Sequence, residues 1–544
     1  MIVVDPVTLG DTSLSGGGGS YYDKNGVLQT AAPGTPRLTY DPADLSKPPA
    51  VMLEPEATNY IRNNTMQGAV GGGVGSGGAL PTNWSASLNN SGSSGMSCAV
   101  VGKGMDEGVD YVDIRFFGTP TLTSDVRLVF ETVYAAPATA GETYSASLFA
   151  KLIAGNWSGV NHWSVVIDEY SSAGSYLVNS NTRHPFPTDA PLPLQRFTHT
   201  RTNTNSSTAY VRSYLGLNVT GGQPIDFTLR IGLPQLERDR VTSPIKASGT
   251  AVTRAAEVVG ATAGLLYSNV PETEPLWVPG TYAKGAKVRD AAHVAYESLV
   301  DANAAPLTDK TKWLNLGATN RAAMFDDRNN TQTSNPEEII VVLSPRAIAQ
   351  GLLLGNLDAT VIGVSATVPN YGVAYSETSS LIVSRSKSSF FRWGFNRLKR
   401  RSLFLTLKLP IFFNGVVTVT IRRPGGVAKC GMCMIGPTVD PGPTLMGLSS
   451  EIKDYSTTLF NTDGSSETIP RGYRKLMSMD VSIDTDRVVE AEEQMIAWRQ
   501  KNVVWVGAPS RLDTIIVGRY SSFKKVIESF PRSKMALQIE GVLS

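Results

Sequence analysis

The stretch VDYVDIRFFG, residues 109–118, alternates apolar and polar side chains over most of its length. Successive side chains of a β-strand point to opposite faces of a sheet, so a period of two predicts a half-buried strand. Five other stretches between Val51 and Val259 share the period: DVRLVFETVY (125–134), TYSASLFAKLI (143–153), HWSVVIDEY (162–170), STAYVRSYLGL (207–217) and DFTLRIGLPQLE (226–237). Turn residues separate them at regular intervals, which predicts a jelly-roll β-sandwich over residues 51–259.

Composition extends the β interpretation to the whole chain. With 544 residues, the chain is too long for one core, and its 51 glycines, 32 prolines and 18% charged residues favour many short strands joined by turns. A net charge of +2 provides no global field to recruit nucleic acid or a membrane. No apolar run is long enough to span a bilayer, and Met1–Ser20 lacks the pattern of a secretory signal.

The predicted fold class is therefore mainly β and multidomain. We expect an N-terminal docking segment (1–50), the jelly roll (51–259), a linker (260–273), a small three-stranded module (274–317) and a C-terminal β-rich domain (318–544). The Gly/Ser/Asn tract from Gly68 to Gly95 is expected to form a long loop at the rim of the jelly roll.

The C-terminal domain is expected to hold one or two helices. One is predicted at residues 485–502, with Thr485 or Asp486 as its cap. Its loose apolar face comprises Val488, Val489, Ala491, Met495, Ile496 and Trp498.

Four phrases in the N-terminal half resemble a known family. They are YYDKNGVLQTAAPGTPRLTYDP (21–42), VMLEPEATNYIRNNTM (51–66), PTNWS (81–85) and LPQLERDRVTSPIKASGTAVTRAAEVV (233–259). In this order they are similar to tail and other virion proteins of bacteriophages and prophages, where they bracket a carbohydrate-binding-like jelly roll. The glycine-rich insertion GAVGGGVGSGGAL (68–80) departs from that pattern.

The resemblance implies a structural protein of a tailed-phage virion, in the tail, baseplate or fibre, made in the host cytoplasm and acting by adhesion and assembly without chemistry. It also implies other virion proteins as partners, a homotrimer and attachment to a host-surface glycan. The alternative from the enzyme class is a polysaccharide-degrading tailspike, which usually shows a long parallel β-helix of repeated short strands. A secreted lectin is a third class, disfavoured by the missing signal peptide.

Residues 274–317 are similar to the small chitin-type carbohydrate-binding module. The matching positions are Trp277, Gly280, Tyr282, Gly285, Val288, Tyr296, Asn303, Pro306 and Trp313. Aromatic faces stack on the apolar faces of sugar rings, so Tyr282, Tyr296, Trp277 and Trp313 are the candidate carbohydrate-binding residues. The alternative is that these rings form the small core of a module that has little else to bury.

The run SRSKSSFFRWGFNRLKRRS, residues 384–402, contains seven Lys or Arg residues with interleaved aromatics. This composition suits either single-stranded nucleic acid or a contact between subunits. Because the whole chain is nearly neutral, we favour the contact. Its candidate residues are Arg392, Trp393, Arg397, Lys399, Arg400 and Arg401.

No motif indicates a catalytic centre, a metal site or a cofactor. The histidines, His162, His184, His199 and His293, are scattered without metal-ligand or catalytic spacing. Cys430 and Cys433 form a single C-x-x-C pair that no second pair completes, and with Cys98 as the remaining cysteine a disulfide framework is not expected. We therefore expect no cofactor and no enzymatic activity.

Overall fold

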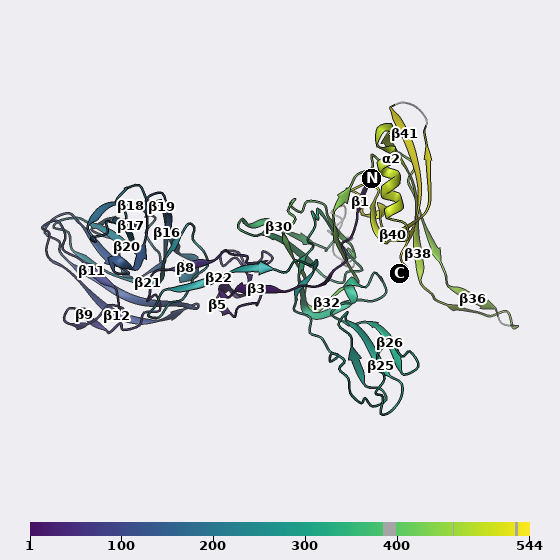
Figure 1. The fold of residues 1–544 in the computed structure, drawn as a ribbon, viewed down its shortest axis with the longest axis horizontal. Coiled ribbons are helices and arrows are strands. Elements are labelled where there is room, and N and C mark those ends of the chain that lie inside the picture. Colours follow the sequence, from purple (N-terminus) through teal and green to yellow (C-terminus); the bar gives the residue numbers. More distant parts are fainter. Residues whose placement is uncertain (384–398, 461, 528–530, 544) are drawn as a thin grey trace, which may run out of the picture. The chain divides into compact units, whose positions relative to one another are not determined.

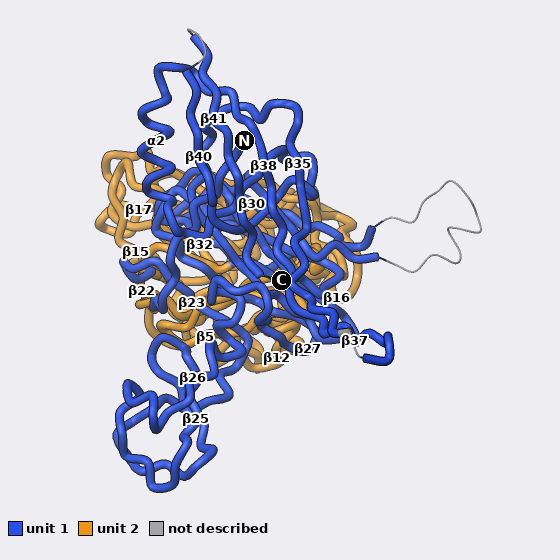
Figure 2. The backbone as a smooth tube through the Cα atoms, turned by 90° about the vertical axis from the view of Figure 1, so that its right-hand side faces the viewer, with its two compact units in different colours: residues 1–13, 48–50, 259–544 blue, residues 14–47, 51–258 orange. Residues whose placement is uncertain are grey.

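The computed structural model describes residues 1–383, 399–460, 462–527 and 531–543. The chain is mainly β, as predicted, and divides into two compact units (Figure 2). Unit 1 contains residues 1–13, 48–50 and 259–544, and unit 2 contains residues 14–47 and 51–258. Among the described residues, no helix is long and apolar enough to cross a membrane.

Unit 2 contains a β-sandwich of two largely antiparallel sheets (Figure 1). The first runs in the order β10-β9-β12-β13-β21-β16-β19: β9 (Gly72–Val74), β10 (Gly77–Gly78), β12 (Met96–Asp106), β13 (Val109–Gly118), β16 (Thr143–Gly155), β19 (Arg196–Thr202) and β21 (Ile225–Arg238). The second runs β11-β14-β20-β17-β18, with β15 also on β20: β11 (Ser85–Ser87), β14 (Ser124–Val129), β15 (Ala136–Pro137), β17 (Val160–Tyr170), β18 (Tyr176–His184) and β20 (Tyr210–Val219).

The sandwich core follows from the alternation seen in the sequence. Every second residue of the long strands enters one cluster, with Phe116, Leu148, Trp163 and Leu217 completely buried. Each of the six predicted stretches overlaps a strand, and the stretch 109–118 coincides with β13.

The glycine-rich insertion forms short strands where a loop was expected. β9 and β10 pair in parallel within residues 68–80, and β11 follows. A Cβ atom on Gly78 would lie 2.1 Å from the carbonyl oxygen of Gly72, so a side chain does not fit between the two backbones. The glycines therefore permit a close backbone contact that apolar periodicity does not reveal.

The N-terminal segment predicted over residues 1–50 is divided between the two units. Residues 1–13 belong to unit 1, where β1 (Ile2–Val4) pairs with two C-terminal strands. The remainder lies almost entirely in unit 2 and contributes β3 (Leu14–Gly17), β4 (Gly19–Tyr22), β5 (Leu28–Ala31) and β6 (Leu38–Thr39). β3 joins β22 (Val252–Val259) and β8 (Ala57–Asn59) in a three-stranded sheet, and β4 pairs with β5.

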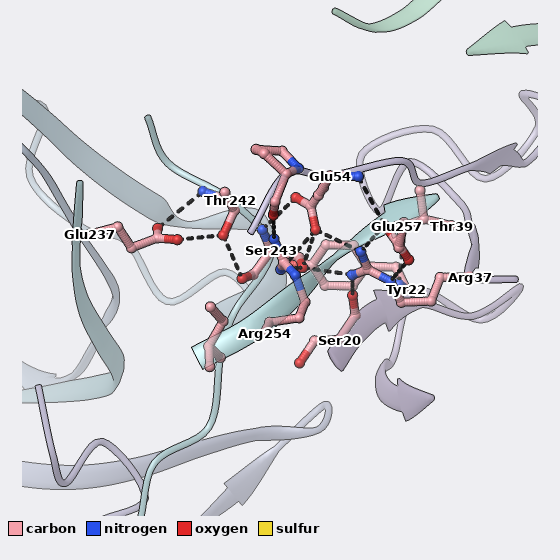
Figure 3. Close-up of polar contacts among 12 residues, drawn as sticks. Ser20, Tyr22, Arg37, Thr39, Glu54, Glu237, Thr242, Ser243, Arg254 and Glu257 are labelled. Atoms are coloured by element: carbon pink, nitrogen blue, oxygen red, sulfur yellow. Dashed lines mark hydrogen bonds and ion pairs between the residues drawn. The ribbon is translucent and has the colours of Figure 1, made fainter. Parts of the chain in front are cut away.

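A buried charge network, shown in Figure 3, connects these N-terminal elements with the strand that leaves the sandwich. The Arg37 side chain is fully buried and donates to both carboxylate oxygens of Glu257, each at 2.7 Å. It also donates to Glu54 at 2.8 Å, and Arg254 pairs with the same Glu54 oxygen at 2.9 Å. The hydroxyl of Ser243 accepts from both arginines and donates to Glu54 at 2.6 Å.

The network keeps Arg37 and Glu54 ionised despite their burial. Burial opposes the charge of Arg37, but hydrogen bonds and charges from Glu257 and Glu54 outweigh it and raise the pKa of Arg37. Burial likewise opposes the charge of Glu54, but Arg254 and Arg37 outweigh it and hold the pKa of Glu54 below its ordinary value. A buried charge is tolerated only when partners compensate its lost hydration, so each residue of the network requires the others as partners.

Outside the small module, unit 1 contains two large sheets and a three-stranded sheet. One has the order β2-β23-β27-β32-β29-β30: β2 (Gly10–Asp11), β23 (Gly264–Ser268), β27 (Thr333–Ser344), β29 (Val361–Val368), β30 (Gly372–Ser380) and β32 (Val416–Cys430). A second has the order β34-β1-β39-β40-β41-β38-β35: β34 (Thr438–Val439), β35 (Ser449–Asp454), β38 (Tyr473–Asp484), β39 (Val503–Val506), β40 (Ile515–Val526) and β41 (Arg532–Gly541). The third is β31-β28-β33: β28 (Gly351–Gly355), β31 (Phe404–Thr406) and β33 (Met432–Gly436).

Two details of unit 1 differ from the sequence-based expectations. The predicted linker 260–273 contains β23, which pairs with β27 because its short apolar run, Leu265-Leu266, completes that sheet. Helix α2 spans Val488–Ala497 and follows a 3-10 turn, so Thr485 and Asp486 lie in the turn and no side chain caps the helix.

The predicted apolar face of α2 is also narrower than expected. Its buried residues are Val488, Ala491, Met495 and the following Trp498, which share one stripe at spacings of three and four. Val489 and Ile496 lie off that stripe and are each 66% exposed.

Candidate functional site

Two of the four aromatic residues predicted in the small module pack against each other. The module sheet consists of β24 (Lys287–Arg289), β25 (Val294–Ser298) and β26 (Trp313–Ala318). Trp313 is 2% exposed, and its Nε1 donates to the carbonyl oxygen of Ala305 at 2.9 Å. The Tyr282 ring meets Trp313 edge-on, with centroids 5.4 Å apart, and its hydroxyl donates to Val278 at 2.7 Å. This pair forms part of the module interior.

The other two module rings are partly buried and lie apart from that pair. Trp277 has a buried Nε1 that no described residue accepts from. Tyr296 pairs with Val288 across the module sheet, and its hydroxyl lies 3.5 Å from a carboxylate oxygen of Asp290. Burial and the charge of Asp290 raise the pKa of Tyr296. The four candidate residues therefore do not join into one aromatic surface in the described structure.

The candidate assembly contact is described only in part. Arg392, Trp393 and Arg397 lie outside the described residues. Lys399, Arg400 and Arg401 are exposed, and Arg400 forms an ion pair with Asp358 at 2.7 Å.

Buried histidine and cysteine side chains of the described chain are neutral. Burial lowers the pKa of His199 to about 4, and its ring nitrogens contact the hydroxyls of Ser180 and Thr182. Burial raises the pKa of Cys430 to about 12 and that of Cys433 well above its ordinary value. Among the described residues, no group of three or more His, Cys, Asp or Glu side chains could hold a metal ion.

The outward side of the second sandwich sheet carries a concentration of tyrosines that we name the tyrosine face. Its members are Tyr134, Tyr170, Tyr176, Tyr210, Tyr214, Arg127, Arg212 and Asp168. Strand alternation explains it: along β20, Val211, Leu215 and Leu217 enter the sandwich core. Tyr210, Arg212 and Tyr214 occupy the intervening positions and therefore face the other way.

Four rings of the tyrosine face form a row across neighbouring strands. Tyr170 on β17 lies opposite both Tyr210 on β20 and Tyr176 on β18. The Tyr134 ring, from the 3-10 turn Val133–Ala135, meets Tyr210 edge-on at 5.2 Å, and Tyr170 meets Tyr176 at 6.2 Å. Tyr134 is 58% exposed and Tyr176 is 52% exposed, so both ends of the row are open to solvent.

A glycine makes room for the exposed ring of Tyr134. Gly174 has a φ of +75°, and a Cβ atom there would lie 2.4 Å from the Tyr134 hydroxyl oxygen. The turn between β17 and β18 therefore requires glycine for both its backbone conformation and this contact.

Charged groups lie directly beside the tyrosine row. The Arg212 guanidinium is 4.8 Å from the Tyr170 ring centre, and the Arg127 guanidinium is 5.3 Å from that of Tyr214. Asp168 is fully buried, and its Oδ2 accepts from the Tyr170 hydroxyl at 2.9 Å and lies 3.6 Å from Arg212. Its Oδ1 has no partner of acceptable hydrogen-bond geometry among the described residues, although Tyr214 lies close to the carboxyl group.

Burial sets the protonation of this cluster. It raises the pKa of Asp168 against the opposing effects of Tyr170, Arg212 and Arg127. Burial and the nearby Asp168 also raise the pKa of Tyr170 and of Tyr214, so both phenols stay protonated. The open rings of Tyr134 and Tyr176 can stack on a sugar, and the hydroxyl and guanidinium groups beside them can hydrogen-bond its hydroxyls.

The tyrosine face was not predicted from the sequence, although part of its signal is present there. Tyr210-x-Arg212-x-Tyr214 and Asp168-x-Tyr170 occupy alternate positions within two predicted strands. In both strands the apolar residues of the alternating pattern enter the sandwich core. The same period of two places these tyrosine, arginine and aspartate residues on the opposite face of the sheet. Tyr134 and Tyr176 join only through strand pairing, which the local sequence does not give.

No protein-family model and no curated protein matches the chain. Solved structures resemble parts of it. The arabinose-bound MgGH51 α-L-arabinofuranosidase has a TM-score of 0.24 at 14% identity, over 35% of this chain and 27% of that chain. The enzymatically active domain of a bacteriophage CBA120 tailspike protein has a TM-score of 0.17 at 12% identity, over 29% of this chain and 20% of that chain.

A family 11 carbohydrate-binding module of a Clostridium thermocellum cellulosomal cellulase has a TM-score of 0.17 at 13% identity, over 29% of this chain and 88% of that chain. This chain thus spans about a quarter of the first solved structure and a fifth of the second. All three TM-scores are far below 0.5, so the fold of this chain is defined by its own strands.

Replacing Asp168 with Asn is expected to change the pH dependence of stability. A raised pKa means that the folded protein binds the proton more tightly than the unfolded chain. The favourable contribution of protonated Asp168 is complete below about pH 4 and is lost as the pH rises through the folded pKa. The D168N variant lacks this loss, so its free energy of unfolding should exceed that of the wild type increasingly from pH 4 to pH 7.

The measurement is urea unfolding of both proteins across that pH range. Asp226→Asn is the control with the opposite sign, because Arg115 holds the pKa of Asp226 below its ordinary value. If the D168N variant is less stable than the wild type at pH 7 and equally stable at pH 4, the pKa of Asp168 is not raised in the folded protein and the prediction is wrong.

Proposed function

We propose that the chain is a structural component of a tailed-phage virion, in the tail, baseplate or fibre, that takes part in particle assembly and attaches to a host-surface glycan through the tyrosine face. The observation that carries the glycan half is the row of four tyrosine rings, open at both ends and flanked by Arg212 and Asp168. The virion half is supported by the four phrases of the N-terminal half. Three of them supply the residues of the Arg37 network.

The tyrosine face suits a glycan chain better than a small compact ligand. Its four rings come from three strands and one turn, so they extend across the sheet. Tyr134 and Tyr176, at the two ends of the row, are exposed, whereas Tyr170 between them is buried. The two exposed rings can each cover the apolar face of a sugar unit, while hydroxyl and guanidinium groups hydrogen-bond the sugar edges. No chemistry is required of the site for this purpose, and the proposed role is attachment alone.

The alternative function, a polysaccharide-degrading tailspike, is favoured by one observation. Asp168 is a buried carboxyl group with a raised pKa beside the tyrosine row, and a general acid for glycoside hydrolysis needs those properties. One observation disfavours this alternative. Neighbouring strands of the sandwich pair antiparallel, except for β9 and β10, whereas such enzymes are expected to contain a parallel β-helix.

Tyr134→Ala and Tyr176→Ala are expected to weaken glycan binding without changing the thermal melt. Each lost ring should reduce the association constant by roughly 2- to 13-fold, because an aromatic contact contributes about 0.5–1.5 kcal/mol. Both side chains are more than half exposed, so their truncation leaves the sandwich core intact. The measurement is a glycan array on the full chain, followed by calorimetric titration with the best glycan.

Tyr371→Ala is the matched control, since Tyr371 is 80% exposed and belongs to unit 1. Unchanged glycan affinity in both tyrosine-face variants would refute the proposed site. Release of oligosaccharide from host polysaccharide by the purified protein, abolished in D168N, would replace attachment with hydrolysis.

The assembly half of the proposal is supported by an apolar β-arm in unit 1. Strands β35 and β38 continue into the hairpin of β36 (Thr457–Phe460) and β37 (Ser466–Ile469) (Figure 1). Ile452 is 68% exposed, Leu459 48% and Ile469 40%. A two-stranded hairpin with exposed apolar residues is marginally stable alone, so the arm is suited to a neighbouring subunit or another virion protein.

We expect the protein to be a homotrimer, with a light-scattering mass three times that of the 58.2 kDa chain. Ile452→Asp should shift it towards monomer, because a charge in an apolar subunit contact is costly. Val489→Asp is the control, since Val489 is 66% exposed on α2. A stable monomer at micromolar concentration would contradict the trimer, and equal effects of both variants would exclude the arm.

A further inference from the structure

Unit 1 contains a cavity of about 370 Å³ beside the small module. Its walls come from β2, β23, β26, the turn before β25 and the 3-10 turn Ala323–Phe325. That volume lies at the lower end of the range for small-molecule sites, which is about 300–1,000 Å³. None of the four aromatic residues predicted in the module lines it, and it contains no residue of the tyrosine face.

Two arginines that line the cavity have charges without partners. Neither the Arg321 nor the Arg328 side chain forms a hydrogen bond or an ion pair within the described part of the chain. The Nε atom of Arg321 is moreover buried without an acceptor. A buried guanidinium nitrogen without an acceptor is unfavourable, so its presence beside a cavity calls for an anionic or strongly accepting ligand.

The carboxylates that line the same cavity already have partners. A carboxylate oxygen of Asp11 lies 3.0 Å from Nε2 of His293. The other ring nitrogen of His293, Nδ1, contacts the carboxylate of Glu272. Asp326 accepts from the backbone N–H of Arg328 at 2.9 Å and from the hydroxyl of Thr331 at 2.8 Å. Both carboxylates thus have hydrogen-bond partners, whereas neither guanidinium group has one within the described part of the chain, and of the two only Arg321 has its Nε buried.

The remaining lining indicates the kind of molecule that bears the anion. Phe325 provides an aromatic wall that is partly buried, and Asn315 provides a polar side chain. An apolar wall opposite hydrogen-bonding groups suits a sugar ring, which has an apolar face and a hydroxylated edge. Guanidinium groups bind carboxylates through paired N–H donors.

We propose that this cavity binds one carboxylate-bearing sugar unit, a uronic acid, with its carboxylate held by Arg321 and Arg328 and its ring against Phe325. The site lies in a different unit from the tyrosine face and goes beyond the proposed function. It would add recognition of an acidic sugar to the glycan contact proposed for the tyrosine face.

The test is a titration of the full chain with D-glucuronate, D-glucose and inorganic phosphate, followed by saturation-transfer NMR and calorimetry. D-Glucuronate should bind at least about 10-fold more tightly than D-glucose, since charge-assisted hydrogen bonds are about twice as strong as neutral ones. Arg328→Gln should weaken glucuronate binding about 10-fold or more. Arg511→Gln, an exposed arginine of unit 1 outside the cavity, should leave it unchanged.

Arg328 is exposed, so the R328Q variant is expected to fold. If Arg321→Gln lowers the melting temperature, the glucuronate affinity of R328Q alone tests the site. Equal affinity for glucuronate and glucose, no binding of glucuronate at millimolar concentration, or full affinity in R328Q would each overturn the proposal. Phosphate binding that excludes glucuronate would overturn the assignment to a sugar. Tyr176→Ala should keep glucuronate binding, which separates failure of this site from failure of the tyrosine face.

Discussion

Arg37 and Glu257 are 220 positions apart in the sequence, and their side chains meet through two parallel 2.7 Å hydrogen bonds in the interior of unit 2. A fully buried guanidinium group has no water to replace a missing partner, so the backbone around it must deliver carboxylates at fixed positions. Glu54 provides the second carboxylate, and Arg254 and Ser243 complete the set. The N-terminal segment, the start of the sandwich and the strand that leaves it are thereby joined at one point.

This constraint gives a physical meaning to the phrases that resemble phage virion proteins. Arg37 belongs to the first phrase, Glu54 to the second, and Ser243, Arg254 and Glu257 to the last. Their spacing along the chain is wide, yet their side chains contact one another (Figure 3). The phrases therefore mark the frame of the domain, whereas the tyrosine face lies on strands between them, where binding residues can change without disturbing the network.

Elements with a strong local signal were predictable from the sequence. The alternation in residues 109–118 reproduced β13 at both ends, because every second side chain enters the core there. Elements that depend on distant partners were not predictable. Strand β23 was assigned to a linker, because its five residues are too few to show a period of two. Helix α2 was predicted, but it lacks the expected side-chain cap. The Arg37 network was missed for the same reason, since Arg37 pairs with residues far along the chain. Of the tyrosine row, Tyr170 and Tyr210 alternate within predicted strands, whereas Tyr134 reaches Tyr210 only through a turn.

The module at 274–317 shows how far residue type alone can take an interpretation of function. Its four rings matched a sugar-binding pattern, and the structure places Trp313 and Tyr282 in a mutual packing contact. On the tyrosine face, by contrast, Tyr134 and Tyr176 remain open because a sheet of the sandwich already has its other side buried. Exposure therefore depends on which face of a completed core a ring occupies.

The Arg37 network holds unit 2 together, and the free energy of unfolding of Arg37→Ala measures how much it contributes. Hydrogen exchange of amides in β16 and β20 reports the opening of unit 2 separately from that of unit 1. Loss of Arg37 leaves Glu257 and Glu54 buried without their main partner, so we expect a decrease of about 3–5 kcal/mol. Arg115→Ala removes an exposed ion pair with Asp226 in the same unit and should cost less than about 1 kcal/mol. Equal, small decreases of the free energy of unfolding in both variants would mean that the Arg37 network does not hold unit 2 together.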